Sequence, residues 1–318
     1  MSSGEPAASN RSAPAPGLPP VQPPSGRFIV QLFVVPGLIV LAVVLVLMAI
    51  AYSTSQNTPD YYLNRLDSEN ADIRWRAASD LAQILKRPES GSLRWKADAH
   101  FALELAERLR ESLDELAQAE KEVDAKLTAH LAEMKNKGIA VPPADIDVHW
   151  RKIAALRNHV SFLASALGDL HVPAGVPLLA EICLADKSPD IKGNTLQRRK
   201  ALWSLANLGA NTRGFAKLPS DKQAEALEAL KAEASGATLR AGWARTALYY
   251  LGSPPDSSDG VVHVDAVLAR CAEAEDRFLR EQVAQACNFW DGPLIEPTLV
   301  KLQQDDGHGT LIHVTEQD

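Results

Sequence analysis

Hydrophobic residues downstream of residue 53 recur at three- and four-residue spacing, and the alternating β-branched runs that strands require are missing. The stretch Ile73–Leu81, with the sequence IRWRAASDL, shows the pattern in its shortest form. Ala and Leu lie on one face of a helix at this spacing, and charged residues occupy the other face. The pattern therefore predicts an all-α protein.

A continuous apolar run of 25 residues occupies positions 28–52, with the sequence FIVQLFVVPGLIVLAVVLVLMAIAY. About 20 apolar helical residues span a bilayer core, so the run predicts one transmembrane helix in contact with membrane lipid. A cleavable signal peptide is the alternative, because Ala49-Ile50-Ala51 resembles a peptidase site and cleavage would follow Ala51. We favour an uncleaved anchor, since the run exceeds the ~7–15 residues of a signal-peptide core.

The flanking cations predict the orientation of this helix. Arg11 and Arg27 precede it, whereas Arg65 is the first basic residue after it and Asp60 comes earlier. Cytoplasmic flanks of membrane helices carry the excess of Lys and Arg. We therefore expect a single-pass protein with a cytoplasmic N-terminus and an exported C-terminal part.

Short polar tails are expected at both ends of the chain. Residues 1–27 contain seven prolines and no aromatic residue, a composition that predicts a disordered, partly polyproline-like tail. Residues 305–318 form a polar C-terminal tail.

A helical repeat becomes visible when later segments are aligned with the one at Ile73–Leu81. The aligned hydrophobic positions are Leu81, Leu167, Leu205, Leu248 and Cys287, at intervals of 86, 38, 43 and 39 residues. Three intervals lie near the ~40 to 47 residues of a two-helix repeat, and the first is about twice that length. One helical hairpin cannot bury its own apolar face, so the repeat predicts stacked hairpins.

These segments resemble the HEAT/armadillo class of helical repeats. The resemblance rests on DSENADIRWRAASDLAQIL, on SPDIKGNTLQRRKALWSLANLG and on EDRFLREQVAQACNFWDGPLIEPTLVKLQQD. It implies an α-solenoid, with a first hairpin in residues 53–91 and further repeats in residues 148–304. Gly209 and Gly252 are expected just past helix ends. Gln197 and Cys287 depart from the family pattern, which indicates degenerate later units.

Residues 92–147 interrupt the repeat with a long amphipathic helix and a turn. A continuous helix from Ser92 to Lys137 would extend about 65–70 Å. Its apolar seam is formed by Leu109, Leu113, Leu116, Val123, Leu127 and Leu131. We expect the helix from Val148 to Leu170 to cover this seam, and the alternative is a homodimer through the same residues.

The charge balance restricts the class of partner. Beyond residue 53 the chain carries 31 Lys and Arg against 39 Asp and Glu, a net charge of about −8. An acidic surface argues against nucleic acid as a partner. The three cysteines form no CxxC motif; Cys271 and Cys287 either meet as a disulfide across a hairpin or, as we favour, are buried thiols.

Catalytic motifs are missing from the sequence, which contains no GxSxG, P-loop, GxGxxG, HExxH or EF-hand pattern. The eight histidines are scattered, so no metal or other cofactor is predicted. One HEAT-repeat enzyme class, that of deoxyhypusine hydroxylase, binds iron through His-Glu pairs, and this chain has no His-Glu dipeptide. We expect a protein without enzymatic activity.

Basic and aromatic residues on the second helices of the repeats are the candidates for binding a partner. These residues are Arg198, Arg199, Trp203, Arg240, Trp243, Arg245, Tyr249 and Arg280. Trp, Tyr and Arg often dominate the energy of protein interfaces, although such arginines also pair with carboxylates of adjacent turns.

The general organisation resembles bacterial single-pass membrane-anchored HEAT-repeat proteins. It implies a scaffold or adaptor that binds an unknown protein through an extended helical surface. The alternatives are an enzyme accessory related to the HEAT-like proteins that attach pigments, and a self-associating structural protein of the envelope.

Overall fold

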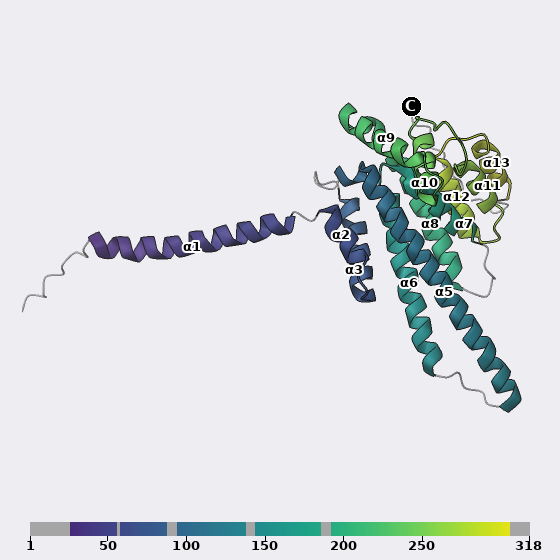
Figure 1. Cartoon of the computed structure of the whole chain (residues 1–318), viewed down its shortest axis with the longest axis horizontal. Coiled ribbons are helices and arrows are strands. Elements are labelled where there is room, and N and C mark those ends of the chain that lie inside the picture. Colours follow the sequence, from purple (N-terminus) through teal and green to yellow (C-terminus); the bar gives the residue numbers. More distant parts are fainter. Residues whose placement is uncertain (1–25, 56–57, 88–93, 138–143, 186–191, 306–318) are drawn as a thin grey trace, which may run out of the picture. The chain divides into compact units, whose positions relative to one another are not determined.

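The computed structural model describes residues 26–55, 58–87, 94–137, 144–185 and 192–305. Every regular element in these ranges is a helix, which confirms the all-α prediction for the part of the chain described (Figure 1). The elements are α1 (Gly26–Ser55), α2 (Pro59–Leu66), α3 (Ala71–Lys86), α5 (Ala99–Lys137), α6 (Ala144–Gly168), the 3₁₀ turn η1 (Pro173–Gly175), α7 (Val176–Leu184), α8 (Lys192–Thr212), the 3₁₀ turn η2 (Phe215–Lys217), α9 (Ser220–Ala234), α10 (Leu239–Tyr250), α11 (Val264–Cys271), α12 (Arg277–Cys287) and α13 (Ile295–Asp305).

The chain divides into two compact units, residues 1–57 and 58–318. The first contains α1, whose segment Val30–Ala49 has a mean hydropathy of 3.1 and no buried residue. This helix is long and apolar enough to cross a membrane, and a signal sequence would have the same properties. Pro36 lies within α1, in keeping with the tolerance of membrane helices for proline.

The second unit has one continuous hydrophobic core. Buried apolar residues form a single cluster from Tyr62 on α2 to Leu302 on α13. The segments predicted as 53–91, 92–147 and 148–304 all contribute to this core. The aligned repeat residues Leu81, Leu167, Leu205, Leu248 and Cys287 are buried, with at most 4% of their surface exposed.

Four helices pack side by side through this unit. Helix α3 packs on α6, α6 packs on α8, and α8 packs on α12. Each of the four also packs on the helix that precedes it in a hairpin: α2 on α3, α5 on α6, α7 on α8 and α11 on α12. We refer to α3, α6, α8 and α12 as the inner row.

The hairpin of α9 and α10 does not continue the inner row. Helix α10 packs on α9, η1, α7 and α5, while α8 packs directly on α12. The sequence alignment placed α10 between α8 and α12, so the order of the hairpins along the chain differs from their order in space. Contacts with α5 and η1 instead hold the α9–α10 hairpin on the first helices of other hairpins, which we call the outer helices.

Helix ends follow local chemistry at several positions. The side chains of Asn70, Thr238 and Asp276 accept hydrogen bonds from the first backbone N–H groups of α3, α10 and α12. Gly252 follows α10 with φ of +74°, as expected for a glycine past a helix end.

The same expectation is wrong for Gly209, which lies inside α8. A Cβ atom at Gly209 would lie 2.7 Å from Nε1 of Trp290. This glycine therefore permits the close approach of Trp290, and a helix end is not its role.

The long helix begins later than the sequence pattern predicted. A short helical turn at residues 94–96 ends at Ala97, and Asp98 then caps α5 by accepting a hydrogen bond of 3.1 Å from the N–H of Phe101. With 39 residues, α5 extends about 58 Å. It runs beside α6 as a long hairpin (Figure 1), so the partner helix expected within the chain covers its seam.

Candidate protein-binding face and polar cleft

The arginines of α8 are engaged within the protein. Arg199 forms a bidentate pair with Asp276 at the start of α12, with N–O distances of 2.6–2.9 Å. Nε of Arg198 donates to the carbonyl of Cys183 at 2.8 Å. Both side chains are half-buried, and their bonds connect α8 to its two neighbours.

The arginines of the last repeats also have internal partners. Nη1 of Arg240 lies 2.8 Å from Glu104 and 2.9 Å from Glu107, which ties α10 to α5. Arg245 donates to three backbone carbonyls, and Arg280 donates to the carbonyls of residues 274 and 275. These contacts give the three arginines a structural role; a partner groove built on them remains a prediction.

The aromatic candidates differ from one another in exposure. Trp243 is buried in the core with 6% of its surface exposed, whereas Tyr249 is 43% exposed and packs edge-on against Tyr250 and His263. Trp203 is half-buried on α8, and the ammonium of Lys86 lies 4.8 Å from its ring centre. Of these three, Trp203 alone faces a cation from another helix of the inner row.

The apolar seam of α5 is mostly covered. Leu109, Leu116 and Val123 are buried, Leu113 and Leu127 are half-buried, and Leu131 is 55% exposed. Helix α6 supplies the cover from the same chain. A homodimer through this seam remains a prediction, and Leu131 near the end of α5 is the part left open for it.

Four aromatic residues of the inner row form what we call the aromatic–cation face: Trp75 on α3, Phe162 on α6, Trp203 on α8 and Phe278 on α12. Trp75 stacks on Phe162 with ring centres 6.5 Å apart and planes 24° from parallel. Phe278 is 58% exposed and Trp75 is 37% exposed, so two of the rings present much of their surface to solvent.

Cations lie over three of these rings. The guanidinium of Arg199 is 4.6 Å from the centre of Phe278, and that of Arg76 is 5.9 Å from the centre of Trp75. Together with Lys86 over Trp203, they give the face a repeated pairing of ring and cation. Such pairs contribute about 0.5–1 kcal/mol at exposed sites, which is enough to hold the rings in place.

The four residues belong to one continuous surface. On α8, Arg199 and Trp203 are one turn apart and share a side of the helix; Arg199 contacts α12, while Trp203 contacts Lys86 of α3. On α3, Lys86 lies three turns after Trp75 and therefore on the same side. The contacts thus connect α3, α6, α8 and α12 across a single face of the unit.

Sequence reasoning missed Trp75, Phe162 and Phe278 as binding candidates, although a signal for them exists. Each ring lies well away from the buried aligned position of its own helix. At 100° per residue, the angle around the helix axis is about 120° between Trp75 and Leu81 and about 140° between Phe162 and Leu167. It is about 180° between Phe278 and Cys287. A large aromatic residue so far from the core side of a helix is expected at the surface.

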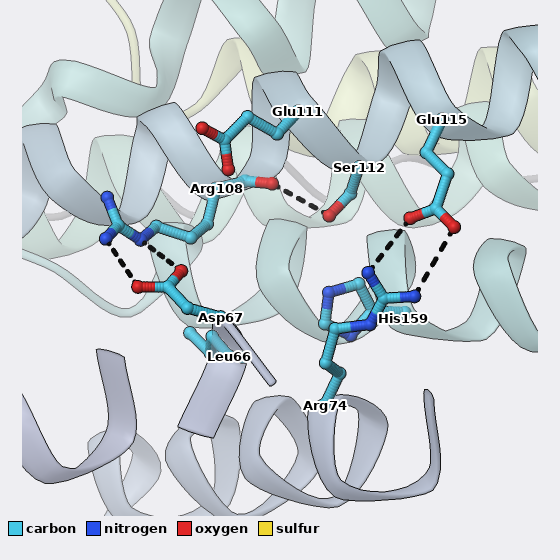
Figure 2. Close-up of a pocket in the computed structure, with 8 residues that line it drawn as sticks. All are labelled: Leu66, Asp67, Arg74, Arg108, Glu111, Ser112, Glu115 and His159. Atoms are coloured by element: carbon cyan, nitrogen blue, oxygen red, sulfur yellow. Dashed lines mark hydrogen bonds and ion pairs between the residues drawn. The ribbon is translucent and has the colours of Figure 1, made fainter. Parts of the chain in front are cut away.

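A polar cleft lies between the α2–α3 pair and the α5–α6 pair (Figure 2). Its volume is about 390 Å³, and its lining residues are Leu66, Asp67, Arg74, Arg108, Glu111, Ser112, Glu115 and His159. Two bidentate pairs cross it: Arg74 with Glu115 at 3.1 and 3.4 Å, and Arg108 with Asp67 at 2.8 and 3.0 Å. These pairs fasten α2 and α3 to α5.

The cleft shows no arrangement for catalysis among its described lining residues. Burial, helped by the charge of Arg74, lowers the pKa of His159 to about 4, so its ring is neutral near pH 7. The hydroxyl of Ser112 donates to the carbonyl of Arg108 at 2.7 Å, so its proton is not shared with a base. The described residues also contain no cluster of three or more His, Cys, Asp or Glu side chains able to hold a metal ion. The ion pairs of the cleft join helices, and the aromatic–cation face is the better candidate for a binding surface.

Comparisons with family models, with curated proteins and with solved structures found no match to this chain.

Proposed function

We propose that this protein is a membrane-anchored helical scaffold that binds another protein through the aromatic–cation face. The observation that carries the proposal is the row of partly exposed rings on successive helices, since buried or half-buried aromatic anchors dominate protein interfaces. Trp75 and Phe278 supply apolar area, and the cations beside them supply charge.

The proposed architecture is a short α-solenoid. Its units would be the hairpins α2–α3, α5–α6, α7–α8 and α11–α12, which support the idea because their second helices pack on one another in the inner row. The α9–α10 hairpin would be an insertion on the outer helices. In such a solenoid the second helices line an extended binding surface, which is where the four rings lie.

The proposed partner carries an acidic segment with apolar side chains. Exposed Arg76 and Lys86 lie over two of the rings. Exposed Lys200 lies three residues before Trp203 on α8, and Arg151 lies three turns before Phe162 on α6. Among nearby acids, Asp276 pairs with Arg199 and Glu281 pairs with Arg277, while Asp72 is exposed one turn before Trp75. The whole chain has a net charge of −7, so a basic face on it favours an acidic partner through complementary potential.

Helix α1 is the proposed uncleaved anchor. Arg11 and Arg27 favour a cytoplasmic N-terminus with residues 58–318 exported, which would place the face at an extracytoplasmic membrane surface. An alkaline phosphatase fused after Asp318 should be active in cells. An inactive phosphatase together with a fluorescent C-terminal fusion would reverse the orientation.

Site-specific photo-crosslinking tests the binding proposal. A photoreactive amino acid replaces Trp75 in one full-length variant and Phe278 in another, and a control variant carries it at Leu239, which is 69% exposed on α10. We expect both face variants, but not the control, to form the same adduct with another protein. The adduct should weaken when Lys86 and Lys200 are both changed to Glu.

Two results would oppose this proposal. Equal adducts from Leu239 and from the face positions would remove the face as the binding site. Adducts that contain a second copy of this chain alone would replace the scaffold with a self-associating structural protein.

A further inference from the structure

Two of the three cysteines meet where α7 and α11 pack together. Cys183 is the penultimate residue of α7 and Cys271 is the last residue of α11, and neither exposes any surface. Sγ of Cys271 donates to the carbonyl oxygen of Cys183 at 3.6 Å, and the two thiols are close enough to influence each other's ionisation. All three cysteines are buried thiols in the structure, the interpretation that the sequence favoured for Cys271 and Cys287. The thiol neighbour of Cys271 is Cys183 on another hairpin, whereas the alternative disulfide paired it with Cys287.

Arg198 organises this pair from α8. Its Nε donates to the same Cys183 carbonyl at 2.8 Å, which fixes the end of α7 next to Cys271. Burial raises the pKa of the Cys183 thiol, whereas the hydrogen bond with Cys183, aided by the Arg198 charge, lowers the pKa of the Cys271 thiol. These opposite shifts arise from contacts of the closed fold and show that the two thiols are neighbours there.

We propose that Cys183 and Cys271 form a disulfide that links α7 to α11 in the mature protein. This proposal rests on the proposed export of residues 58–318, because disulfides persist in oxidising compartments. The oxidant is a protein disulfide of the thiol–disulfide oxidoreductase class. The thiolate of one of the two cysteines attacks it to give a mixed disulfide, and the sulfur of the other cysteine then displaces the oxidant.

The thiols of Cys183 and Cys271 are oxidised to a disulfide, and the disulfide of the oxidoreductase is reduced to a dithiol. The two protons of the cysteine thiols end on that dithiol. Since both cysteines are buried in the folded protein, the exchange takes place during folding, before α7 and α11 close over the sulfurs.

The bridge would restrain a long part of the chain. Its ends are 88 residues apart, and the closed loop contains α8, α9 and α10. Closing a loop of this length in the unfolded chain is expected to raise the Tm by about 10 °C relative to the reduced protein. Cys287 takes no part and stays a free thiol.

Thiol counting on the full-length protein tests the proposal. Cells are quenched in acid, the protein is unfolded, and free thiols are tagged with a polymer-linked maleimide, with and without prior reduction. We expect one tag on the unreduced wild type and three after reduction. Cys287→Ala should take no tag unless reduced, and Cys183→Ala should take two in either case; the linked peptide should contain Cys183 and Cys271.

A second measurement separates the geometry from the export. Purified full-length protein in detergent is equilibrated with oxidised glutathione below its Tm, where local opening exposes the thiols, and its linked peptides are identified. If the disulfide forms with glutathione but the thiols are free in cells, the proposal is overturned because its premise, the export of residues 58–318, is wrong. If neither sample contains the Cys183–Cys271 disulfide, or if the linked peptide joins Cys271 to Cys287, the proposed pairing is wrong. The proposed export of residues 58–318 is unaffected by that result.

Discussion

Arg240 holds the α9–α10 hairpin to α5, so its replacement by Ala should destabilise the fold. Its Nη1 bonds Glu104 and Glu107, and its Nε lies 3.3 Å from Glu233. The arginine side chain is only 18% exposed. Removing it ends the pair with Glu233 and leaves Glu104 and Glu107 with Arg108, at 2.6 and 4.0 Å, as their neighbouring cation.

The free energy of unfolding lost in Arg240→Ala depends on how far its ion pairs are buried. Breaking a fully buried pair costs about 3–5 kcal/mol, and exposed pairs contribute at most about 1 kcal/mol. Because Glu107 and Glu233 are about 40% exposed, we place the loss at about 2–3 kcal/mol, or a Tm decrease of about 5–10 °C. Burial raises the pKa of Glu104, but its bond to Arg240 and the nearby positive charges outweigh burial and lower it overall; in Arg240→Ala this pKa should rise.

Thermal unfolding of the full-length protein in detergent, followed by circular dichroism, measures the effect. Arg110→Ala is the matched control, since Arg110 pairs with Asp114 and Glu181, which are 61% and 54% exposed. It should lower the Tm by no more than about 3 °C. An Arg240→Ala variant as stable as the wild type, but with its partner adduct lost, would refute the structural role and restore Arg240 to the binding site.

Three further substitutions test the interior. Burial raises the pKa of Asp169 to about 6, so its stabilising effect is complete below pH 4 and about 3 kcal/mol is lost as pH rises through 6; the stability of Asp169→Asn should therefore increase relative to that of the wild type as pH rises from 4 to 6. Burial lowers the pKa of His159 to about 4, so its stabilising effect is complete above pH 6.5 and is lost as pH falls towards 4, opposite in sign to that of Asp169; the stability of His159→Gln should therefore increase relative to that of the wild type as pH falls from 6.5 to 4. Gly209→Ala should cost about 1–3 kcal/mol in denaturant unfolding, because its Cβ would collide with Trp290; an unchanged midpoint would contradict the packing.

Local patterns in the sequence predicted the helices and the core well. The aligned leucines at 81, 167, 205 and 248 are all buried because a 3.6-residue period directly reports which side of a helix is apolar. The glycine after α10 was also predictable, because a positive φ is a local requirement.

Features that depend on long-range packing were not predictable from the pattern. Repeat spacing gives the order of hairpins along the chain, but it contains no information on whether α10 or α12 lies next to α8. Gly209 resembles a helix end because a leucine precedes it, yet its role is set by Trp290, 81 residues away in sequence.

The candidate site shows the same division. Arginine and aromatic residues on second helices suggested an interface, and the pattern could not tell which arginines would find acids from other helices. Arg199 and Asp276 are 77 residues apart in the sequence, and Arg240 and Glu104 are 136 apart, so each pair forms only when the chain folds. The rings of Trp75 and Phe278 stay partly exposed although Arg76 and Arg199 lie over them.

Hydroxyl-radical footprinting of the full-length protein most directly tests whether the aromatic–cation face is occupied. Oxidation of Trp75 and Phe278 is compared between native membranes and protein purified in detergent, with exposed Tyr249 on α10 as the internal reference. The scaffold account predicts that both face residues are protected in native membranes and become reactive after purification, while Tyr249 reacts equally in both. Equal oxidation of Trp75 and Phe278 in the two samples would show an unoccupied face and contradict the account.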